Sequence, residues 1–441
     1  MKKCKFYWCF IAVILLLAVT LSVGALVFGP AKAGANEQLT KAPVLIKGDG
    51  TWNPDFLSDT AEWFSDHFLL RQELISAGNW LSANVFRTCG SEDVILGKEG
   101  WLFYADTLAD FSYFEPFTPW EECSIANNLE LMAEYVEGSG RKFLFAVAPN
   151  KNSLYPETMP DRAMENGKSN WMALFGSLEH SGVPYVNLFS AFREQNEVLY
   201  FAHDSHWNSK GAALGADVIN AGFGIKTDYF SGDYSQTEPH NGDLYEMLYP
   251  AFRDSEENPV YGGELHFTYT GNGKSPDSIT LETTGTGKGK LLAYRDSFGN
   301  LLYPYLADSY GEAYFSRSTV YDLTMDADYV LIELVERNLR YLISYVPVMP
   351  SPVRVIAVPE AANGTVQMEV TKGKAPENYV QYRGNLSEWD IPSEIYVICG
   401  GEAYEAFLLK DGGFAVNVPE NTAVEAVIYT VGGEQKLLTV Q

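Results

Sequence analysis

Two short segments carry the residue types of a centre that attacks esters or transfers acyl groups. Asp204 and His206 stand two residues apart in an Asp-Ser-His-Trp sequence, and Ser297 lies much later in an Arg-Asp-Ser-Phe-Gly sequence. Each segment comes at the end of an apolar run that is typical of a β-strand. Because parallel strands present side chains at their carboxyl ends, the sequence predicts a triad in which a serine nucleophile, an imidazole base and an orienting carboxylate meet.

Each of these residues also has a structural interpretation, which stays open on residue types alone. Serine and aspartate are common helix N-caps, and Asp296 and Ser297 stand where a helix is expected to begin. The same helix start offers backbone amides that stabilise an oxyanion, so one turn can hold the nucleophile and part of the oxyanion hole. The Asp-x-His spacing is compatible with a carboxylate that orients its imidazole, but it does not require one.

The segments around these residues alternate between strand and helix patterns. Residues 143–148 are apolar throughout, as in a parallel strand that is covered on both faces. This alternation predicts an α/β fold with a doubly wound parallel sheet and right-handed crossovers. We expect the other strands at residues 185–188, 290–294, 313–316 and 329–333, and the helices at residues 124–138, 171–180, 208–221, 301–307 and 336–345.

Three other regions depart from this alternation. Residues 59–84 have apolar side chains at the spacing of an amphipathic helix, and residues 94–104 hold two β-rich runs around a Gly-Lys-Glu-Gly turn. Residues 224–288, rich in Gly, Tyr and Thr, are expected to form β structure over the entrance to the site. Beyond a group of prolines that ends at residue 352, strand-like runs between Gly-rich turns predict an all-β module. Sandwich packing and carbohydrate binding are both open for this module.

The N-terminus predicts export from the cell. Three lysines precede an uncharged, mostly apolar run over residues 6–28. This run is longer than the core of a cleavable signal peptide, about 7 to 15 residues, and is near the roughly 20 residues that span a bilayer. We favour an uncleaved signal anchor in the cell membrane, with the remainder of the chain extracytoplasmic by the positive-inside rule. Cleavage after Ala31-Lys32-Ala33, which would give a secreted protein, is the alternative.

The predicted organisation has four parts in 441 residues. Residues 1–33 are the signal anchor or signal peptide, and residues 34–50 are a polar linker. Residues 51–352 form the α/β domain, and residues 353–441 form a small β-rich accessory domain.

Composition excludes several classes of partner and cofactor. The net charge of -26, from 57 acidic and 31 basic residues, is opposite to the basic footprint that a nucleic-acid partner requires. Of the five cysteines, two fall in or beside the apolar N-terminal run, and the odd number that is left gives no disulfide framework. The sequence has no Cys-x-x-Cys pair and no cysteine–histidine cluster that would indicate a zinc site. Serine acyl transfer needs no metal, and no cofactor is expected.

Five motifs follow one another along the chain. They are Ser65-Asp66-His67-Phe68 with Arg71, the 94–104 hairpin, Pro149-Asn150-Lys151, Asp204-Ser205-His206-Trp207 and Asp296-Ser297-Phe298-Gly299. In this order the chain resembles the DHHW proteins from about residue 52 to residue 346, and it is similar to the exported alginate O-acetyltransferases. The resemblance implies an SGNH-hydrolase-like domain in which Ser297 is the nucleophile, His206 the general base and Asp204 the group that orients it.

Two positions depart from these families. Ser205 replaces the first of the two adjacent histidines of the DHHW motif, and Arg295 stands where the alginate enzymes usually have Gly before Asp-Ser. A side chain there restricts access to the backbone, so we expect the amide of the nucleophile to be an oxyanion donor, with help from the loop of Asn150 and Lys151. Asn150 is equally well explained as a turn residue. Arg337, just beyond the last strand, is placed for substrate contact or for a structural ion pair.

The resemblance implies an extracytoplasmic O-acetyltransferase that acetylates a cell-surface polysaccharide through an acetyl-enzyme. The family comparison implies a membrane-bound O-acyltransferase as the acetyl donor, because a domain outside the cell has no direct access to cytoplasmic acetyl-CoA. Two other functions stay open. One is a carbohydrate acetyl esterase of the same fold, in which water replaces the sugar hydroxyl. The other is a non-catalytic glycan-binding protein of the cell envelope, in which the serine, histidine and aspartate would lie apart.

Overall fold

The computed structural model describes residues 39–161, 167–234, 237–371, 374–386 and 394–440, together with scattered positions between residues 7 and 27. The predicted signal anchor or signal peptide falls largely outside these described residues. Among the positions that are described, no helix is both long and apolar enough to cross a membrane.

A seven-stranded sheet forms the centre of the α/β part, in the order β4-β3-β11-β9-β10-β8-β7. Five neighbouring strands run parallel, and β8 runs antiparallel to both β10 and β7. The sheet is therefore mixed, whereas the sequence predicted a parallel one. The loop between β7 and β8 is too short for a parallel crossover, which needs about a dozen residues or more. The strands are β3 (Lys142–Ala148), β4 (Tyr185–Val186), β7 (Thr268–Tyr269), β8 (Thr280–Thr284), β9 (Lys290–Tyr294), β10 (Glu312–Ser316) and β11 (Tyr329–Val335).

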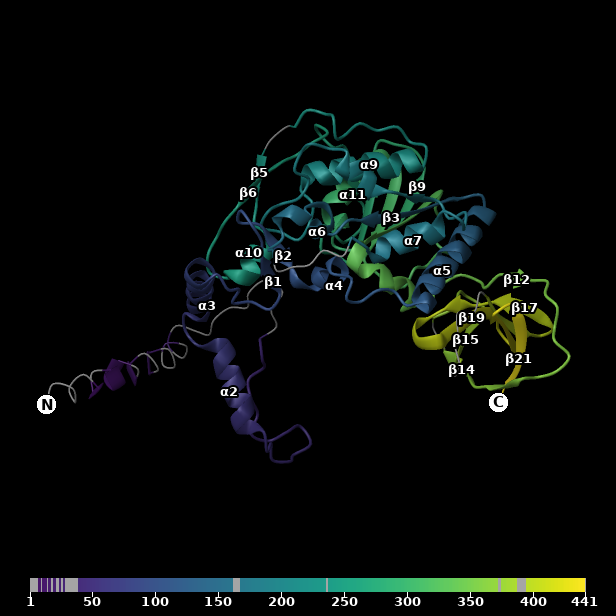
Figure 1. The fold of residues 1–441 in the computed structure, drawn as a ribbon, viewed down its shortest axis with the longest axis horizontal. Coiled ribbons are helices and arrows are strands. Elements are labelled where there is room, and N and C mark those ends of the chain that lie inside the picture. The colour runs from purple at the N-terminus through teal and green to yellow at the C-terminus, as the bar shows by residue number, and fades with distance from the viewer. Residues whose placement is uncertain are drawn as a thin grey trace.

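Helices cover both faces of this sheet, which confirms the predicted α/β class (Figure 1). α5 (Pro119–Gly138) and α7 (Asn170–Leu178) pack on one face, and α8 (Leu188–Arg193), α9 (Ser209–Gly222) and α11 (Gly299–Ser309) pack on the other. Alternate side chains of β3 enter the two cores: Phe143, Phe145 and Val147 join the first, and Leu144, Ala146 and Ala148 join the second. Burial on both faces explains why β3 is apolar throughout.

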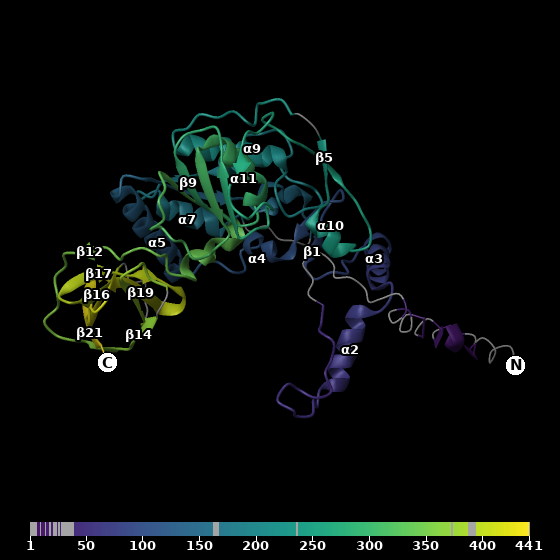
Figure 2. The ribbon, with the colours of Figure 1, turned by 180° about the vertical axis from the view of Figure 1, so that it is seen from behind.

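The region before the sheet contains two helices and a hairpin. α2 (Phe56–His67) and α3 (Arg71–Leu81, continued to Phe86 by a wider helical turn) replace the single helix predicted over residues 59–84. The first helix ends where Phe68 becomes extended, and Leu70, with a left-handed φ of 60°, precedes the second. In both views α2 extends away from the sheet (Figures 1 and 2), and none of its side chains is buried. The predicted hairpin is confirmed as β1 (Val94–Leu96) and β2 (Leu102–Tyr104).

The described chain beyond residue 352 is almost wholly β, as expected. Two sheets, in the orders β12-β17-β16-β20-β21-β13 and β14-β15-β19-β18, enclose an apolar core that includes Val397, Val416 and Val427. The predicted boundaries between the four parts of the chain stay predictions. The strands are β12 (Val353–Arg354), β13 (Gly364–Val366), β14 (Met368–Thr371), β15 (Tyr379–Asn385), β16 (Ile395–Cys399), β17 (Glu402–Glu405), β18 (Phe407–Leu408), β19 (Gly413–Pro419), β20 (Val424–Val431) and β21 (Glu434–Val440).

Helix α5 joins the β module to the α/β part. In both views the module lies beside this helix (Figures 1 and 2). The buried amide of Asn128 donates to the carbonyl oxygens of Leu342 and Leu408 and accepts from the amide of Leu408. Trp120 donates its indole N–H to the carbonyl of Leu409. Since Phe407 and Ala415 belong to the same apolar cluster as α5, the core continues from one part into the other.

Replacing Asn128 by Ala tests this junction. The substitution leaves three buried backbone groups without their partner, so we expect the free energy of unfolding in urea to fall by about 3 kcal/mol. Asn127→Ala is the matched control, because that side chain is only half-buried and makes a longer bond, of 3.3 Å, to the carbonyl of Ala406. Equal losses for the two variants would contradict a junction held by Asn128.

Candidate active site

Ser297 lies in a tight turn between β9 and α11 that Asp296 holds in shape. The Asp296 Oδ1 atom accepts the amide of Phe298 at 2.9 Å. Its Oδ2 atom accepts the amide of Val335, the last residue of the neighbouring strand β11, at 2.8 Å. The same atom accepts the side-chain amide of Asn338 at 2.7 Å. Within the described part of the chain, the amide of Ser297 donates to no protein acceptor, so it is available to a ligand.

The structure brings together the three side chains that the sequence predicted as a triad. The Ser297 hydroxyl donates to His206 Nε2 at 2.8 Å, and His206 Nδ1 donates to Asp204 Oδ1 at 2.7 Å. A carboxylate can only accept at this position, so Nδ1 carries the proton and Nε2 is left to accept from the serine. This arrangement meets the geometric requirement for a nucleophile paired with an oriented base.

Burial and charge act against each other at His206 and Asp204. Burial by itself raises the pKa of Asp204, but the charge and hydrogen bonds of His206 and His240 outweigh it and hold that pKa well below its usual range. Burial by itself lowers the pKa of His206, but Asp204 and then Asp243 outweigh it and raise that pKa above the usual 6.5. Asp204 is therefore ionised, and the imidazole has a strengthened affinity for a proton, as a general base requires.

A second carboxylate lies beside the imidazole. Asp243 accepts the amide of Ser205 at 2.7 Å and its hydroxyl at 2.6 Å, and Asp243 Oδ2 is 3.6 Å from His206 Nδ1. Burial first, and then the charge of Asp204, raise the pKa of Asp243. The ligand atoms of Asp204, His206 and Asp243 lie within 4.8 Å of one another, close enough for a metal ion. A metal bound to Nδ1 would displace the hydrogen bond that orients the imidazole toward Ser297.

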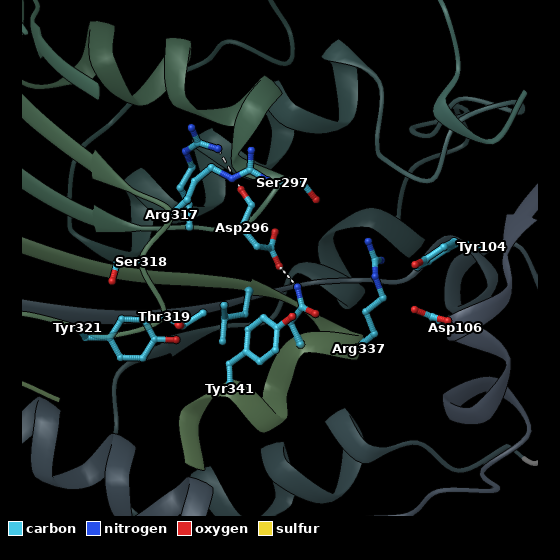
Figure 3. Close-up of a pocket in the computed structure, with 13 residues that line it drawn as sticks. Tyr104, Asp106, Asp296, Ser297, Arg317, Ser318, Thr319, Tyr321, Arg337 and Tyr341 are labelled. Atoms are coloured by element: carbon cyan, nitrogen blue, oxygen red, sulfur yellow. Dashed lines mark hydrogen bonds between the residues drawn. The ribbon is translucent and has the colours of Figure 1, made fainter. Parts of the chain in front are cut away.

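Ser297 opens into a polar pocket of about 590 Å³ (Figure 3). The pocket lies between the turn after β9 and the 3₁₀ helix η4 (Glu336–Ile343) that follows β11. Figure 3 shows Arg337 between Tyr341 and Tyr104. Aromatic rings, three guanidinium groups and hydroxyl groups therefore surround the serine, and the lining includes Tyr104, Asp106, Arg295, Asp296, Arg317, Ser318, Thr319, Tyr321, Leu334, Arg337, Asn338 and Tyr341.

Arg337 is held in the pocket by neutral partners. It donates to Asn150 Oδ1 at 3.2 Å, and its guanidinium lies 5.4 Å from the ring centres of both Tyr104 and Phe298. Among the described residues it forms no ion pair, so the alternative of a structural ion pair is wrong. Asp106 and Asp296 line the same pocket without a direct bond to Arg337, so its guanidinium can still donate to a ligand.

The loop after β3 supports the site from outside the pocket. Lys151 is buried and donates to the carbonyl oxygens of Phe201 and Ala202, each at 3.1 Å, and of Asp204 at 2.5 Å. Burial lowers its pKa to about 8. Neither Asn150 nor Lys151 lines the pocket, and the direct help of this loop to the oxyanion stays a prediction. Asn150 positions Arg337, and Lys151 binds three carbonyl groups of the loop of Asp204, of which that of Ala202 also accepts the amide of Leu102.

Arg295 packs beneath the start of α11. Its guanidinium donates to the carbonyl oxygens of Asp296 and Pro276 and to Asn300 Oδ1. Burial lowers its pKa to about 10. The side chain crosses Gly299 so closely that a Cβ at that position would come within 2.1 Å of Arg295 Cδ. Arg295 therefore lines one side of the pocket and ties the Ser297 turn to the helix that follows it.

Sequence reasoning missed His240 and Asp243. Both lie in the weakly patterned stretch of residues 224–288, which was expected to cover the site entrance. No described residue of that stretch lines the pocket. Its elements β5 (Thr237–His240), α10 (Asp243–Leu248) and β6 (Glu256–Pro259) instead contact the loop of Asp204. The one signal in the sequence was a histidine three residues before an aspartate, which is too common to identify a site.

Part of the chain is similar to known acetyltransferases. Residues 94–260 match the family model of the SGNH hydrolase-like domain of the acetyltransferase AlgX. The predicted resemblance is confirmed. The matched segment contains Asp204 and His206 and ends before Ser297. Over 176 residues the chain is 26% identical to the probable alginate O-acetylase AlgJ of Pseudomonas syringae pv. tomato. That match covers 36% of this chain and 42% of the relative, so the chain spans less than half the length of the relative.

Three solved structures are similar over 56% of this chain. A DHHW family protein from Eubacterium siraeum is 17% identical, with 92% of its chain covered and a TM-score of 0.41. PatB1 of Bacillus cereus is 18% identical, with 97% covered and a TM-score of 0.45. The O-acetyltransferase domain of Pseudomonas putida AlgJ is 16% identical, with 91% covered and a TM-score of 0.38.

The balance of charge and burial at His206 predicts the outcome of an NMR titration. In the unaltered protein the His206 imidazole should titrate above pH 6.5. In Asp204→Asn the charge is gone and burial remains, so the pKa of His206 should fall below 6.5. Asp243→Asn should lower it by a smaller amount. If the pKa of His206 is the same with and without Asp204, the electrostatic account of the site is wrong.

Proposed function

We propose that this chain is an O-acetyltransferase in which Ser297 carries an acetyl group to a hydroxyl of a cell-surface polysaccharide. The proposal rests on the two hydrogen bonds that connect Ser297 to His206 and His206 to Asp204, with Ser297 in the wall of a polar pocket. The match of residues 94–260 to an acetyltransferase family supports the choice of the acyl group.

The reaction proceeds in two halves with the same base. His206 Nε2 takes the hydroxyl proton of Ser297 as Oγ attacks the carbonyl carbon of the acetyl donor, and the amide of Ser297 donates to the oxyanion. The intermediate collapses to acetyl-Ser297, and the leaving group takes the proton from His206. A sugar hydroxyl then attacks the acetyl group while His206 accepts its proton. Collapse of the second intermediate returns the proton to Ser297 and releases the acetylated sugar.

The pocket has the size and chemistry of a glycan site. Its volume of about 590 Å³ lies within the roughly 300 to 1,000 Å³ usual for ligand pockets. Tyrosine rings offer flat apolar faces, and Arg337 and Asn338 offer hydrogen-bond donors to sugar hydroxyl groups. The acidic chain, with a net charge of -26, makes a nucleic-acid acceptor unfavourable.

The remaining assignments follow from the predicted export of the chain. The catalytic part acts outside the cytoplasm, held at the cell membrane by the signal anchor or secreted after cleavage. Its acetyl groups then come from a membrane-bound O-acyltransferase that transfers them across the membrane. Deleting such a partner from the producing cell should remove acetate from the surface polymer while this protein remains folded and present.

The nucleophile is tested by replacing Ser297 with Ala. The purified protein is mixed with an activated acetyl ester, and the intact mass is followed with time. We expect an acetyl adduct on the unaltered protein and none on Ser297→Ala, because the hydroxyl that accepts the acetyl group is absent. Cells that carry Ser297→Ala should lose polymer acetylation although circular dichroism shows a folded protein. Unchanged acetate on the polymer would contradict the proposal.

The fate of the acetyl group separates transfer from hydrolysis. The same incubation is repeated with candidate oligosaccharides, and acetate in water and on sugar is measured separately. Transfer predicts that acetyl groups appear on the sugar and that the acetyl-enzyme disappears faster as its concentration rises. Release into water alone, at a rate that no oligosaccharide changes, would identify an acetyl esterase instead.

Arg337 should act on acceptor binding rather than on acetylation of the enzyme. Losing one hydrogen bond from a charged donor costs about 1.5 to 3 kcal/mol, so Arg337→Ala should raise the KM for the acceptor about tenfold or more. Formation of the acetyl-enzyme should change much less, because the charge of Arg337 makes only a minor contribution to the pKa of His206. Arg253→Ala is the control, because that side chain is 68% exposed and lies outside the pocket. Slower formation of the acetyl-enzyme with an unchanged KM for the acceptor would contradict this, and would show that Arg337 acts in the reaction with the acetyl donor.

A further inference from the structure

A second histidine binds the carboxylate of Asp204 on the side away from His206. His240, at the end of β5, lies with Nε2 at 2.8 Å from Asp204 Oδ2. Its ring stacks on Phe201 with ring centres 4.0 Å apart and an angle of 13° between the planes. The carboxylate can only accept, so Nε2 of His240 carries the proton and donates it. The stack and the hydrogen bond together fix the position of this ring.

The strand that carries His240 belongs to a small unit that encloses the loop of Asp204. Glu256 of β6, which pairs with His240 in the β5–β6 ladder, accepts the amides of Ala202 at 2.7 Å and His203 at 2.8 Å. Gly242 approaches the same loop so closely that a Cβ there would come within 2.1 Å of the carbonyl oxygen of His203. The unit therefore fits the loop closely, and His240 is the member whose side chain reaches the Asp204 carboxylate.

The donors to Asp204 divide evenly between its two oxygen atoms. Oδ1 accepts from the backbone amide of His206 at 2.8 Å and from its Nδ1. Oδ2 accepts from the amide of Asp243 at 3.0 Å and from His240. Without His240, one lone pair of a buried carboxylate oxygen has no donor, and the carboxylate can rotate away from the geometry that suits His206.

We propose that His240 is a positioning residue for acyl transfer, which donates to Asp204 Oδ2 so that Oδ1 stays directed at His206 Nδ1. This inference rests on the proposed function, because its effect is expressed through Ser297. The N–H of His240 also stabilises part of the negative charge of Asp204. Removing its donor makes more of that charge available to His206, which increases the affinity of the imidazole for a proton.

Other charged groups lie near His206 and Asp204, and none of them is substituted in the His240 variants. Asp243 faces His206 from α10, and Lys151 reaches the backbone of Asp204 from the loop after β3. Arg337 acts on His206 from the pocket, and Glu256 lies beyond the loop on β6. A change of pH dependence in a His240 variant therefore reports the lost donor rather than a new arrangement of these charges.

Two substitutions separate the donor from the ring. His240→Phe keeps an aromatic ring on Phe201 and removes the donor, whereas His240→Gln places an amide donor near the position of Nε2 and removes the ring. His240→Ala removes both. The side chain of His240 is 28% exposed, which favours folding of all three variants. Urea unfolding of each variant records any loss of stability separately from the kinetics.

The rate of acetylation of Ser297 by an activated ester is measured from pH 5 to pH 9 for each variant. His240→Phe and His240→Ala should be slower by about tenfold or more, the effect of one hydrogen bond to a charged group. The acid limb of their pH profile should move to higher pH, because His206 holds its proton more tightly. His240→Gln should recover most of the rate and the original limb.

The unaltered protein and Ser297→Ala distinguish the two ways of failing. If the unaltered protein acquires no acetyl group, the proposed function fails. If it is acetylated and His240→Phe matches it in rate and pH profile, the positioning role of His240 is wrong. Equal losses in His240→Gln and His240→Ala would also overturn it, because the donor would then have no effect. Should His240→Phe fail to fold, the comparison of Gln with Ala decides the question.

Discussion

The buried carboxylate of Asp204 is the constraint on which this site depends. An ionised carboxylate without partners is unstable in a protein interior, so its side chain, only 4% exposed, must be fully paired. Four donors meet this need: two from His206, one from the amide of Asp243 and one from His240. They come from its own loop, from α10 and from β5. The weakly patterned chain between β5 and β6 is therefore as much a part of the site as the central sheet.

A matching constraint acts on the turn of Ser297, the proposed nucleophile. Asp296 links the turn of Ser297 to the end of β11 and to Asn338, and Arg295 links the same turn to α11 and to the loop before β8. Both residues lie directly before Ser297, so the turn is held on two sides before any ligand binds. A hydroxyl fixed in this way needs little reorganisation when it attacks, which is the main contribution that a rigid site makes to rate.

The sequence predicted those features that depend on local patterns. Ser297 follows the apolar strand β9, and β3 is apolar because both its faces are buried, so the α/β class was predictable. Asp204 and His206 follow an apolar run that forms only an isolated bridge at Tyr200 instead of the expected strand, yet their meeting with Ser297 was also predicted. The break at Phe68 and the antiparallel β8 were not, since one is set by the backbone of Phe68 and Leu70 and the other by a short loop. His240 and Lys151 act across long distances in sequence. Their roles follow from buried acceptors that only the folded chain reveals.

If His206 and Asp204 act on Ser297 as proposed, Ser297 is the most nucleophilic serine of the chain. The most direct measurement is peptide mapping after brief exposure of the native protein to a phosphonylating serine reagent. The account predicts that Ser297 is labelled first, at a rate that rises with pH as His206 loses its proton. Labelling spread over exposed serines without preference for Ser297 would contradict it.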